Sequence, residues 1–262
     1  MPAKIDDWII PDWPAPARVH ALCTTRAGGV SAAPWDSLNL GDHVGDDARA
    51  VRANRRVLEQ VLARPGAPAR PVYLNQVHGV RAVTLQACSA DGMACDAADT
   101  RTPGIACIVL VADCLPVLFA HRSGTWVAAA HAGWRGLAAG VLEQTLVRAG
   151  AAGHEILAWL GPCIGPRAFE VGAEVLAAFC AHDADAARCF VPGPAPGKYL
   201  ADLAALARQR LARCGVTQVH GNDGSPPWCT VGHPSRFFSH RRDTIRLGGS
   251  GRMAACVWLG AA

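Results

Sequence analysis

Runs of apolar residues, separated by glycine, proline and charged residues, predict alternating strands and helices along the chain. A buried strand is predicted where about four to eight apolar residues follow one another without a helical period. Such runs lie at residues 72–77, 105–112, 117–120, 126–130, 156–160 and 253–259. Apolar positions recur at helical spacing in four other segments, at residues 46–63, 136–149, 168–182 and 201–214.

This alternation predicts a layered domain of the α/β or α+β class. Proline- and glycine-rich stretches at residues 64–71 and 192–197 are short enough to be loops within that pattern. Neither an internal repeat nor a long linker divides the chain. We therefore expect residues 1–262 to form a single domain, although the sequence alone does not order the strands.

Composition supports a globular protein without a nucleic-acid partner. Hydrophobic residues make up 51% of the chain, enough for a sizeable core. The formal charge of +4 comes from arginine, since Lys4 and Lys198 are the only lysines. No basic run or basic-aromatic stripe occurs, so no nucleic-acid partner is expected.

The cysteines and the longest apolar run indicate a cytoplasmic protein without a membrane span. The eleven cysteines are scattered without a CxxC pair, which favours reduced thiols. The segment 1–19 is broken by Asp6, Asp7 and the prolines at 11, 14 and 16, and does not resemble a signal peptide. The apolar run 104–120 is interrupted by Asp113 and is too short to cross a bilayer.

Three short segments, at residues 75–79, 112–117 and 131–136, each place a good zinc ligand beside small or turn-forming residues. The ligands are His78, Cys114 and His131. Two imidazoles and one thiolate suit zinc, and three protein ligands leave a position open for water or substrate, as a catalytic metal requires. The separations of 36 and 17 residues form no zinc-finger pattern, however. Taken singly, each residue would as readily be a buried thiol or a core histidine.

Other polar residues have two interpretations each. Arg26, beside a tight glycine turn, either clamps an anion or is an exposed loop charge. Asn39, between two leucines, either binds substrate or forms a turn. Asp113 either orients a metal ligand or forms a strand-end turn. Arg135 either faces the site or forms a salt bridge.

A cationic group at residues 240–242 follows two phenylalanines, which are expected in the core. One of its two arginines is expected to be structural.

Taken together, these segments resemble the YfiH/laccase-domain family of multicopper-polyphenol-oxidase-like proteins, also called peptidoglycan editing factors. The resemblance runs in order through nearly the whole chain. It is carried by residues 23–31, 37–47, 75–79, 112–117, 131–136, 161–166, 237–243 and 251–254. Two positions depart from the family pattern, with Cys163 where serine is frequent and Phe169 where tyrosine is common.

The resemblance implies a fold and a site. The fold is a single α/β/β/α layered domain with mixed sheets, similar to cytotoxic-necrotizing-factor-like toxin deamidases that use a Cys–His pair. The metal ligands are His78, Cys114 and His131, with zinc preferred over copper. Cys114, His131 and Arg26 are the implied catalytic residues. The implied substrate-binding residues are Asn39, Gln76, Arg135, His240 and Arg241.

The implied activity is that of a zinc-dependent purine nucleoside phosphorylase. Adenosine is the expected substrate, with inosine, guanosine and methylthioadenosine as further ones, and adenosine deamination as a second reaction. Arg26 and Arg241 would offset the charge of phosphate. The partners are therefore a nucleoside and phosphate, and the oligomeric state is not predicted.

Three alternatives remain. Cys114 could act as a nucleophile with His131 as base, on a peptidoglycan precursor or a protein amide. A copper phenol oxidase is disfavoured because no two histidines form an HxH pair. A zinc-stabilised binding module would need a fourth ligand, for which His43 or His240 is the candidate.

Overall fold

The computed structural model describes residues 7–261, whose strands form two large sheets and two small ones. The four-stranded sheet has the order β1 (Val19–Cys23), β15 (Met253–Leu259), β7 (Ile105–Val111) and β2 (Arg70–Val72). The six-stranded sheet has the order β14 (Gln218–Gly221), β10 (Ile156–Leu160), β8 (Leu115–His121), β9 (Val127–Ala132), β6 (Ala97–Thr100) and β4 (Ala82–Thr84). The small sheets are β11 (Glu170–Gly172), β13 (Lys198–Ala201) and β12 (Phe190–Pro192), and β3 (Leu74–Asn75) with β5 (Met93–Ala94).

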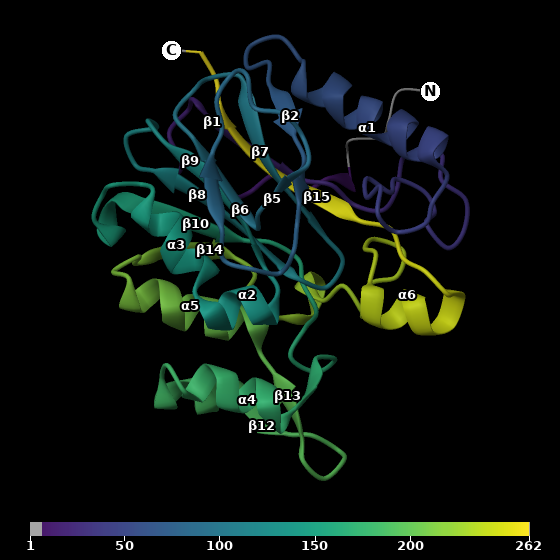
Figure 1. Ribbon diagram of the computed structural model, residues 1–262, viewed down its shortest axis with the longest axis vertical. Coiled ribbons are helices and arrows are strands. Elements are labelled where there is room, and N and C mark those ends of the chain that lie inside the picture. Colours follow the sequence, from purple (N-terminus) through teal and green to yellow (C-terminus); the bar gives the residue numbers. More distant parts are fainter. Residues whose placement is uncertain (1–6, 262) are drawn as a thin grey trace.

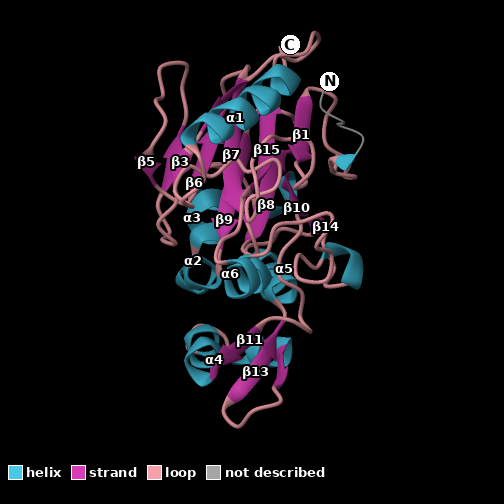
Figure 2. Cartoon of the chain, turned by 90° about the vertical axis from the view of Figure 1, so that its right-hand side faces the viewer, coloured by secondary structure: helices cyan, strands magenta, loops and turns pink. Residues whose placement is uncertain are grey.

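Helices cover the outer faces of the two large sheets, with α1 (Ala48–Leu62) on the four-stranded sheet and α3 (Val141–Val147) and α5 (Leu203–Arg213) on the six-stranded one (Figures 1 and 2). The other helices are α2 (Trp134–Ala139), α4 (Ala173–Cys180) and α6 (His240–Leu247). The hydrophobic core has three main parts that correspond to the layer boundaries. One joins α1 to the four-stranded sheet, one lies between the two sheets, and one joins α3 and α5 to the six-stranded sheet. The order of layers is therefore α/β/β/α, as expected.

The apolar runs predicted as strands are largely observed. Five of them lie on β7, β8, β9, β10 and β15, and every residue of β7, β9, β10 and β15 is buried. Burial on both faces explains why these runs are continuous rather than alternating. No helix within residues 7–261 is both long and apolar enough to cross a membrane.

Three predicted elements were wrong in extent. The run 72–77 is split between β2 and β3, because the backbone of Tyr73 leaves the sheet to bond the Asp91 carboxylate and Gly92. The helix predicted at 136–149 is two helices, α2 and α3, separated by Gly140 with φ of 104°.

The helix predicted at 168–182 begins only at Ala173. The residues before it form β11, whose backbone pairs with β13. The apolar spacing in the sequence does not reveal β11, because a strand of three residues is too short to show an alternating pattern. Figure 1 shows β12, β13 and α4 projecting together below the main sheets.

The connection from β7 to β8 passes from the four-stranded to the six-stranded sheet. Residues 112–114 make this passage, and β9 lies beside β8 in antiparallel register, with Pro116 opposite His131. The crossing therefore brings Cys114 and His131 to the same end of the layered structure.

Candidate metal centre

The structure brings together the three residues that the sequence singles out as zinc ligands. The ligand atoms of His78, Cys114 and His131 all lie within 4.8 Å of one another. The Sγ atom of Cys114 is 3.8 Å from Nε2 of His78, and the two imidazole rings meet edge to face, with centroids 4.8 Å apart. Within residues 7–261 no other group of histidine, cysteine and acidic side chains is arranged in this way. His43 and His240 are not part of the group, so no fourth protein ligand closes it.

Asp96 holds both histidines in place. Its buried carboxylate accepts hydrogen bonds from the backbone N–H groups of Val77, His78 and Gly79, at 3.2, 2.8 and 2.7 Å. The same carboxylate lies 2.9 Å from Nδ1 of His131. A histidine whose Nδ1 is bound in this way presents Nε2 to a metal, which is the usual support for a metal-binding histidine. Burial raises the pKa of Asp96, but the bonds from His131 and Gly79 outweigh it and leave this pKa lowered.

The sequence reasoning missed Asp96. The available signal was a single carboxylate inside the small and apolar run Cys95–Ala98, where a charge is costly unless it is paired.

The space in front of the three ligands is kept open by glycine. A Cβ atom on Gly133 would lie 3.0 Å from Cδ2 of His78, 3.1 Å from Sγ of Cys114 and 3.6 Å from Cε1 of His131. Gly133 has φ of −61°, so its backbone conformation does not require glycine. Glycine is needed here because any side chain would crowd the three ligands. An N/S donor set around a space that one methyl group would fill fits a zinc ion.

The electrostatics of the centre favour an anionic sulfur. Burial raises the pKa of the Cys114 thiol, but His131 and His78 outweigh this effect and bring the pKa down to about 6. For His131, burial lowers the pKa, while Cys114 and Asp96 together raise it to about 9. A thiolate is the form of cysteine that binds metals and acts as a nucleophile.

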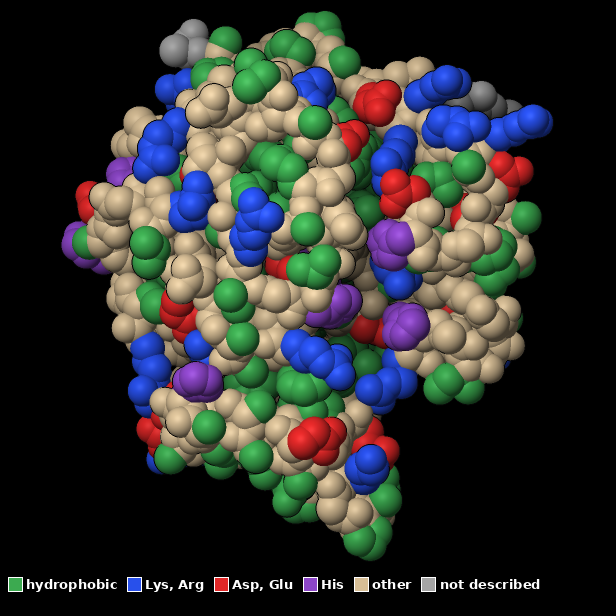
Figure 3. All heavy atoms as spheres, in the orientation of Figure 1, with side chains coloured by type: hydrophobic (Ala, Val, Ile, Leu, Met, Phe, Trp, Pro, Cys, Tyr) green, Lys and Arg blue, Asp and Glu red, His purple; other side chains and the backbone are tan. Residues whose placement is uncertain are grey.

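The ligands lie in a cavity of about 410 Å³, within the range of small-molecule sites. It is lined by His43, Gln76, His78, Leu110, Ala112, Asp113, Cys114, His131, Trp134, Arg135, Ile164, Phe169, Leu203, His240, Arg241 and Arg252. Figure 3 shows histidine and arginine side chains gathered around a hollow on this face of the molecule. The lining therefore combines an apolar surface, able to hold a flat ring, with several cations.

Four of the predicted substrate-binding residues line this cavity. They are Gln76, Arg135, His240 and Arg241. Gln76 is fixed by a pair of hydrogen bonds with the backbone of Leu110, at 2.9 and 2.7 Å. Nη2 of Arg241 donates a hydrogen bond to the backbone carbonyl of Glu170, at 3.1 Å.

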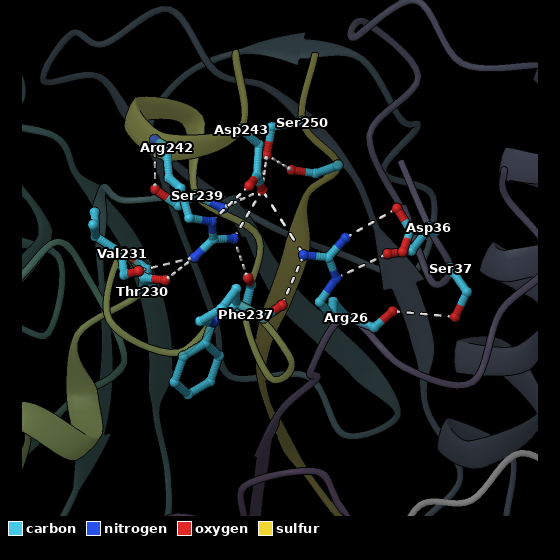
Figure 4. Close-up of polar contacts among 12 residues, drawn as sticks. Arg26, Asp36, Ser37, Thr230, Val231, Phe237, Ser239, Arg242, Asp243 and Ser250 are labelled. Atoms are coloured by element: carbon cyan, nitrogen blue, oxygen red, sulfur yellow. Dashed lines mark hydrogen bonds and ion pairs between the residues drawn. The ribbon is translucent and has the colours of Figure 1, made fainter. Parts of the chain in front are cut away.

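Arg26 does not line the cavity, contrary to expectation. Its guanidinium donates to the carbonyl and carboxylate of Asp36, at 2.9 and 3.1 Å (Figure 4). The same group donates to the carbonyl of Pro234, at 2.8 Å. It also lies 4.0 Å from the carboxylate of Asp243. These contacts use its donors within the protein, so Arg26 joins loops rather than meeting a ligand in this cavity.

Asn39 does not line the cavity either, because it is fully buried. Its side chain bonds both the N–H and the carbonyl of Gly41 and also reaches Asp46. Of its two interpretations, the turn is the one observed.

The cationic group at residues 240–242 divides as expected. Arg242 is structural, because its guanidinium bonds the Asp243 carboxylate and the carbonyls of Thr230, Val231 and Phe237 (Figure 4). His240 and Arg241 face the cavity.

Asp113 forms a strand-end turn with φ of 84° and holds neither histidine. Its carboxylate accepts from the hydroxyls of Thr230 and Ser239 and from the backbone N–H of Arg241. Asp113 therefore attaches the start of α6 to the turn that carries Cys114.

Comparison with known proteins identifies the family. Residues 20–260 match the family model described as multi-copper polyphenol oxidoreductase laccase. The purine nucleoside phosphorylase of Pseudomonas aeruginosa is 55% identical, over 96% of this chain and 98% of its own length. The purine nucleoside phosphorylase YfiH of Escherichia coli is 51% identical, with the same coverage of 96% and 98%.

Solved structures show the same fold. The crystal structure of a Neisseria meningitidis protein matches with a TM-score of 0.89 and 47% identity, covering 97% of this chain and 100% of that one. YlmD from Geobacillus stearothermophilus matches with a TM-score of 0.79 and 31% identity, covering 94% and 93%. The chain thus belongs to the YfiH-like family described as multi-copper polyphenol oxidoreductase laccases, and it is an enzyme.

Proposed function

We propose that this protein is a zinc-dependent purine nucleoside phosphorylase that cleaves adenosine and related purine nucleosides with inorganic phosphate. The observation that carries the proposal is a three-ligand N/S centre, open on one side, in a cavity lined by arginines and aromatic rings. The names of the Pseudomonas and Escherichia relatives support the same reaction. Inosine, guanosine and methylthioadenosine are further proposed substrates.

The lining residues suit both reactants. Trp134, Phe169 and Leu203 offer apolar surface to a purine, and Arg135, Arg241 and Arg252 offer charge to phosphate. Cleavage of the glycosidic bond requires the phosphate oxygen to meet the C1′ carbon as the purine leaves with the bonding electrons. Holding both reactants in one cavity supplies much of the rate enhancement of such a step.

His78, Cys114 and His131 are the residues that would hold zinc. A bound zinc ion supplies Lewis-acid chemistry, which is also suited to activating water for adenosine deamination, a second activity that we propose. Asp96 orients His131, and Gly133 keeps the approach to the three side chains open.

A copper phenol oxidase is not proposed, although the family description mentions copper. Multicopper oxidation needs several copper sites, and residues 7–261 contain one three-ligand group. The eleven free cysteines support the cytoplasm as the compartment that we propose.

A second candidate, hydrolysis by a Cys114 nucleophile, is favoured by one observation. The Cys114 pKa of about 6 beside the His131 pKa of about 9 describes a thiolate–imidazolium pair. Its substrate would be a peptidoglycan precursor or a protein amide.

The decisive experiment incubates the zinc-loaded protein with adenosine, with and without inorganic phosphate, and separates the products by chromatography. Adenine and ribose 1-phosphate appearing only with phosphate is the expected result. Inosine in both samples would demonstrate deamination. Adenosine unchanged in both samples would refute the nucleoside proposal and leave the cysteine hydrolase.

A further inference from the structure

The cavity carries more positive than negative charge, because three arginines lie in a lining whose negative groups are the Asp113 carboxylate and the Cys114 thiolate. Arg135, Arg241 and Arg252 line it, and Asp113 is its only acidic residue. Both carboxylate oxygens of Asp113 are occupied by Thr230, Ser239 and the backbone of Arg241. A cavity with surplus arginine charge favours anions.

The three arginines are not equivalent. Arg135 is exposed, with its guanidinium 4.5 Å from the centroid of the Trp134 ring. Arg241 uses Nη2 on a backbone carbonyl and lies 5.9 Å from the centroid of the Phe169 ring. Arg252 is partly buried.

The guanidinium of Arg252 forms hydrogen bonds through Nη1 and leaves its other two nitrogen atoms free within the described part of the chain. Its Nη1 donates to the carbonyls of Ser250 and Gly251, each at 3.0 Å. Its Nε and Nη2 have no acceptor among residues 7–261. The Nε–Nη2 edge of a guanidinium is one that binds two oxygens of a carboxylate or phosphate side by side.

The sheet register places Arg252 beside the metal centre. Met253 at the start of β15 pairs with Val111 at the end of β7. One further step along these antiparallel strands sets Arg252 opposite Ala112, two residues before Cys114. Leu110 and Ala112, which share a strand face, line the same cavity.

A separate loop, residues 38–46, holds Arg252 in position. Oδ1 of Asn39 accepts a hydrogen bond from the backbone N–H of Arg252, at 2.8 Å. The backbone N–H of Leu40 donates to the backbone carbonyl of Arg252, at 3.0 Å. Gly41 lies against the side chain, since a Cβ atom there would be 2.8 Å from Cγ of Arg252. Asn39, which the family resemblance implies as a substrate-binding residue, thus supports the arginine together with Gly41. Restricting a binding group in this way lowers the entropic cost of binding.

We propose that Arg252 binds the oxyanion co-substrate through its Nε–Nη2 edge and that loop 38–46 is the brace that positions it. The inference rests on the proposed function, in which this anion is inorganic phosphate. Arg252 thereby takes the role that the sequence analysis expected of Arg26.

Arg252→Gln tests the binding role, with Arg188→Gln as the matched control. Arg188 is 85% exposed and pairs only with Asp185, on the helical turn Ala184–Cys189. In the zinc-loaded protein, we expect Arg252→Gln to raise the KM for phosphate by about tenfold to a hundredfold, as for loss of a charged hydrogen bond. The KM for adenosine should change less than about twofold, and Arg252→Lys should fall in between because it keeps the charge without the planar edge.

Gly41→Ala tests the brace without changing any charge. The φ of Gly41 is outside the left-handed region, so alanine fits the backbone and the clash falls on Arg252. We expect a raised KM for phosphate and an unchanged KM for adenosine. An unchanged KM for phosphate in this variant would overturn the brace.

Phosphate binding is also measured directly, by ³¹P NMR titration of each zinc-loaded variant, with zinc content determined in parallel. Loss of binding in Arg252→Gln at full zinc content supports the proposal. Unaltered phosphate binding, or a loss that follows a loss of zinc, would overturn it. If the wild type binds phosphate but releases no purine, the proposed function fails while the anion site is still judged by the titration.

Discussion

At the scale of single residues, the metal centre depends on side chains that would not themselves touch the metal. Asp96 bonds both the loop of His78 and the ring of His131. We expect Asp96→Asn to lower zinc affinity by about tenfold to a hundredfold, since an amide nitrogen would face N–H donors that now meet oxygen. Competition with a chromogenic chelator measures this. Asp185→Asn, on the exposed surface, is the control and should retain wild-type affinity.

A second prediction about zinc affinity concerns Gly133, which also does not bind the metal itself. In Gly133→Ala the new methyl group enters the space between His78 and Cys114, so the ligands must separate. We expect zinc affinity to fall by about tenfold or more, with the metal-free protein folded as before. Elemental analysis and circular dichroism test the two parts. Gly232→Ala is the matched control, because the nearest atoms to a Cβ there are 3.7 Å away; equal zinc loss in both variants would contradict the steric explanation.

The sequence predicts the three ligands but not their support, for a physical reason. His78, Cys114 and His131 are candidates because imidazole and thiolate suit zinc, and the family resemblance, rather than their spacing, assigns them as ligands. Asp96, Arg252 and Asp113 are ordinary charged residues whose importance comes from partners far along the chain. Arg26 shows the converse, since the family resemblance implies a role with substrate, whereas contacts with Pro234 and Asp36 occupy its guanidinium.

At the scale of elements, α6 is attached to the metal loop through Asp113. The carboxylate accepts from Ser239 and from the backbone of Arg241, at the start of the helix. In Asp113→Asn an amide NH₂ group replaces one carboxylate oxygen and faces hydrogen-bond donors. We expect a stability loss of about 1–3 kcal/mol, measured by urea denaturation, and faster proteolysis near α6. Asp223→Asn, at an exposed turn, should show neither effect, and a wild-type unfolding curve for Asp113→Asn would refute the attachment.

Long elements could be predicted from the sequence because their periodicity extends over many residues. The helices α1 and α5 and the strands β7 and β15 fall where the pattern puts them. The strands β3, β5 and β11 have only two or three residues each, too few for any period. Their existence depends on backbone pairing with distant segments, which a local pattern does not contain.

At the scale of the whole molecule, the metal centre is built where the chain crosses between two sheets that share a buried core. That core consists of apolar residues from both sheets and does not include the three ligands. We therefore expect packing, rather than metal, to maintain the scaffold of the centre. This expectation distinguishes the protein from a zinc-stabilised binding module, in which metal and fold are lost together.

Chelation tests this distinction and the proposed reaction in one experiment. We expect removal of zinc to abolish phosphorolysis of adenosine while the far-ultraviolet circular dichroism is unchanged. The melting temperature should fall by only a few degrees, because the metal adds its binding free energy to a core that is already stable. Activity should return when zinc is added back, with the metal-free protein in chelator as control. Unfolding on chelation would instead identify a structural zinc. Hydrolysis that persists or increases without metal would identify Cys114 as the nucleophile, because the thiolate is then released from coordination.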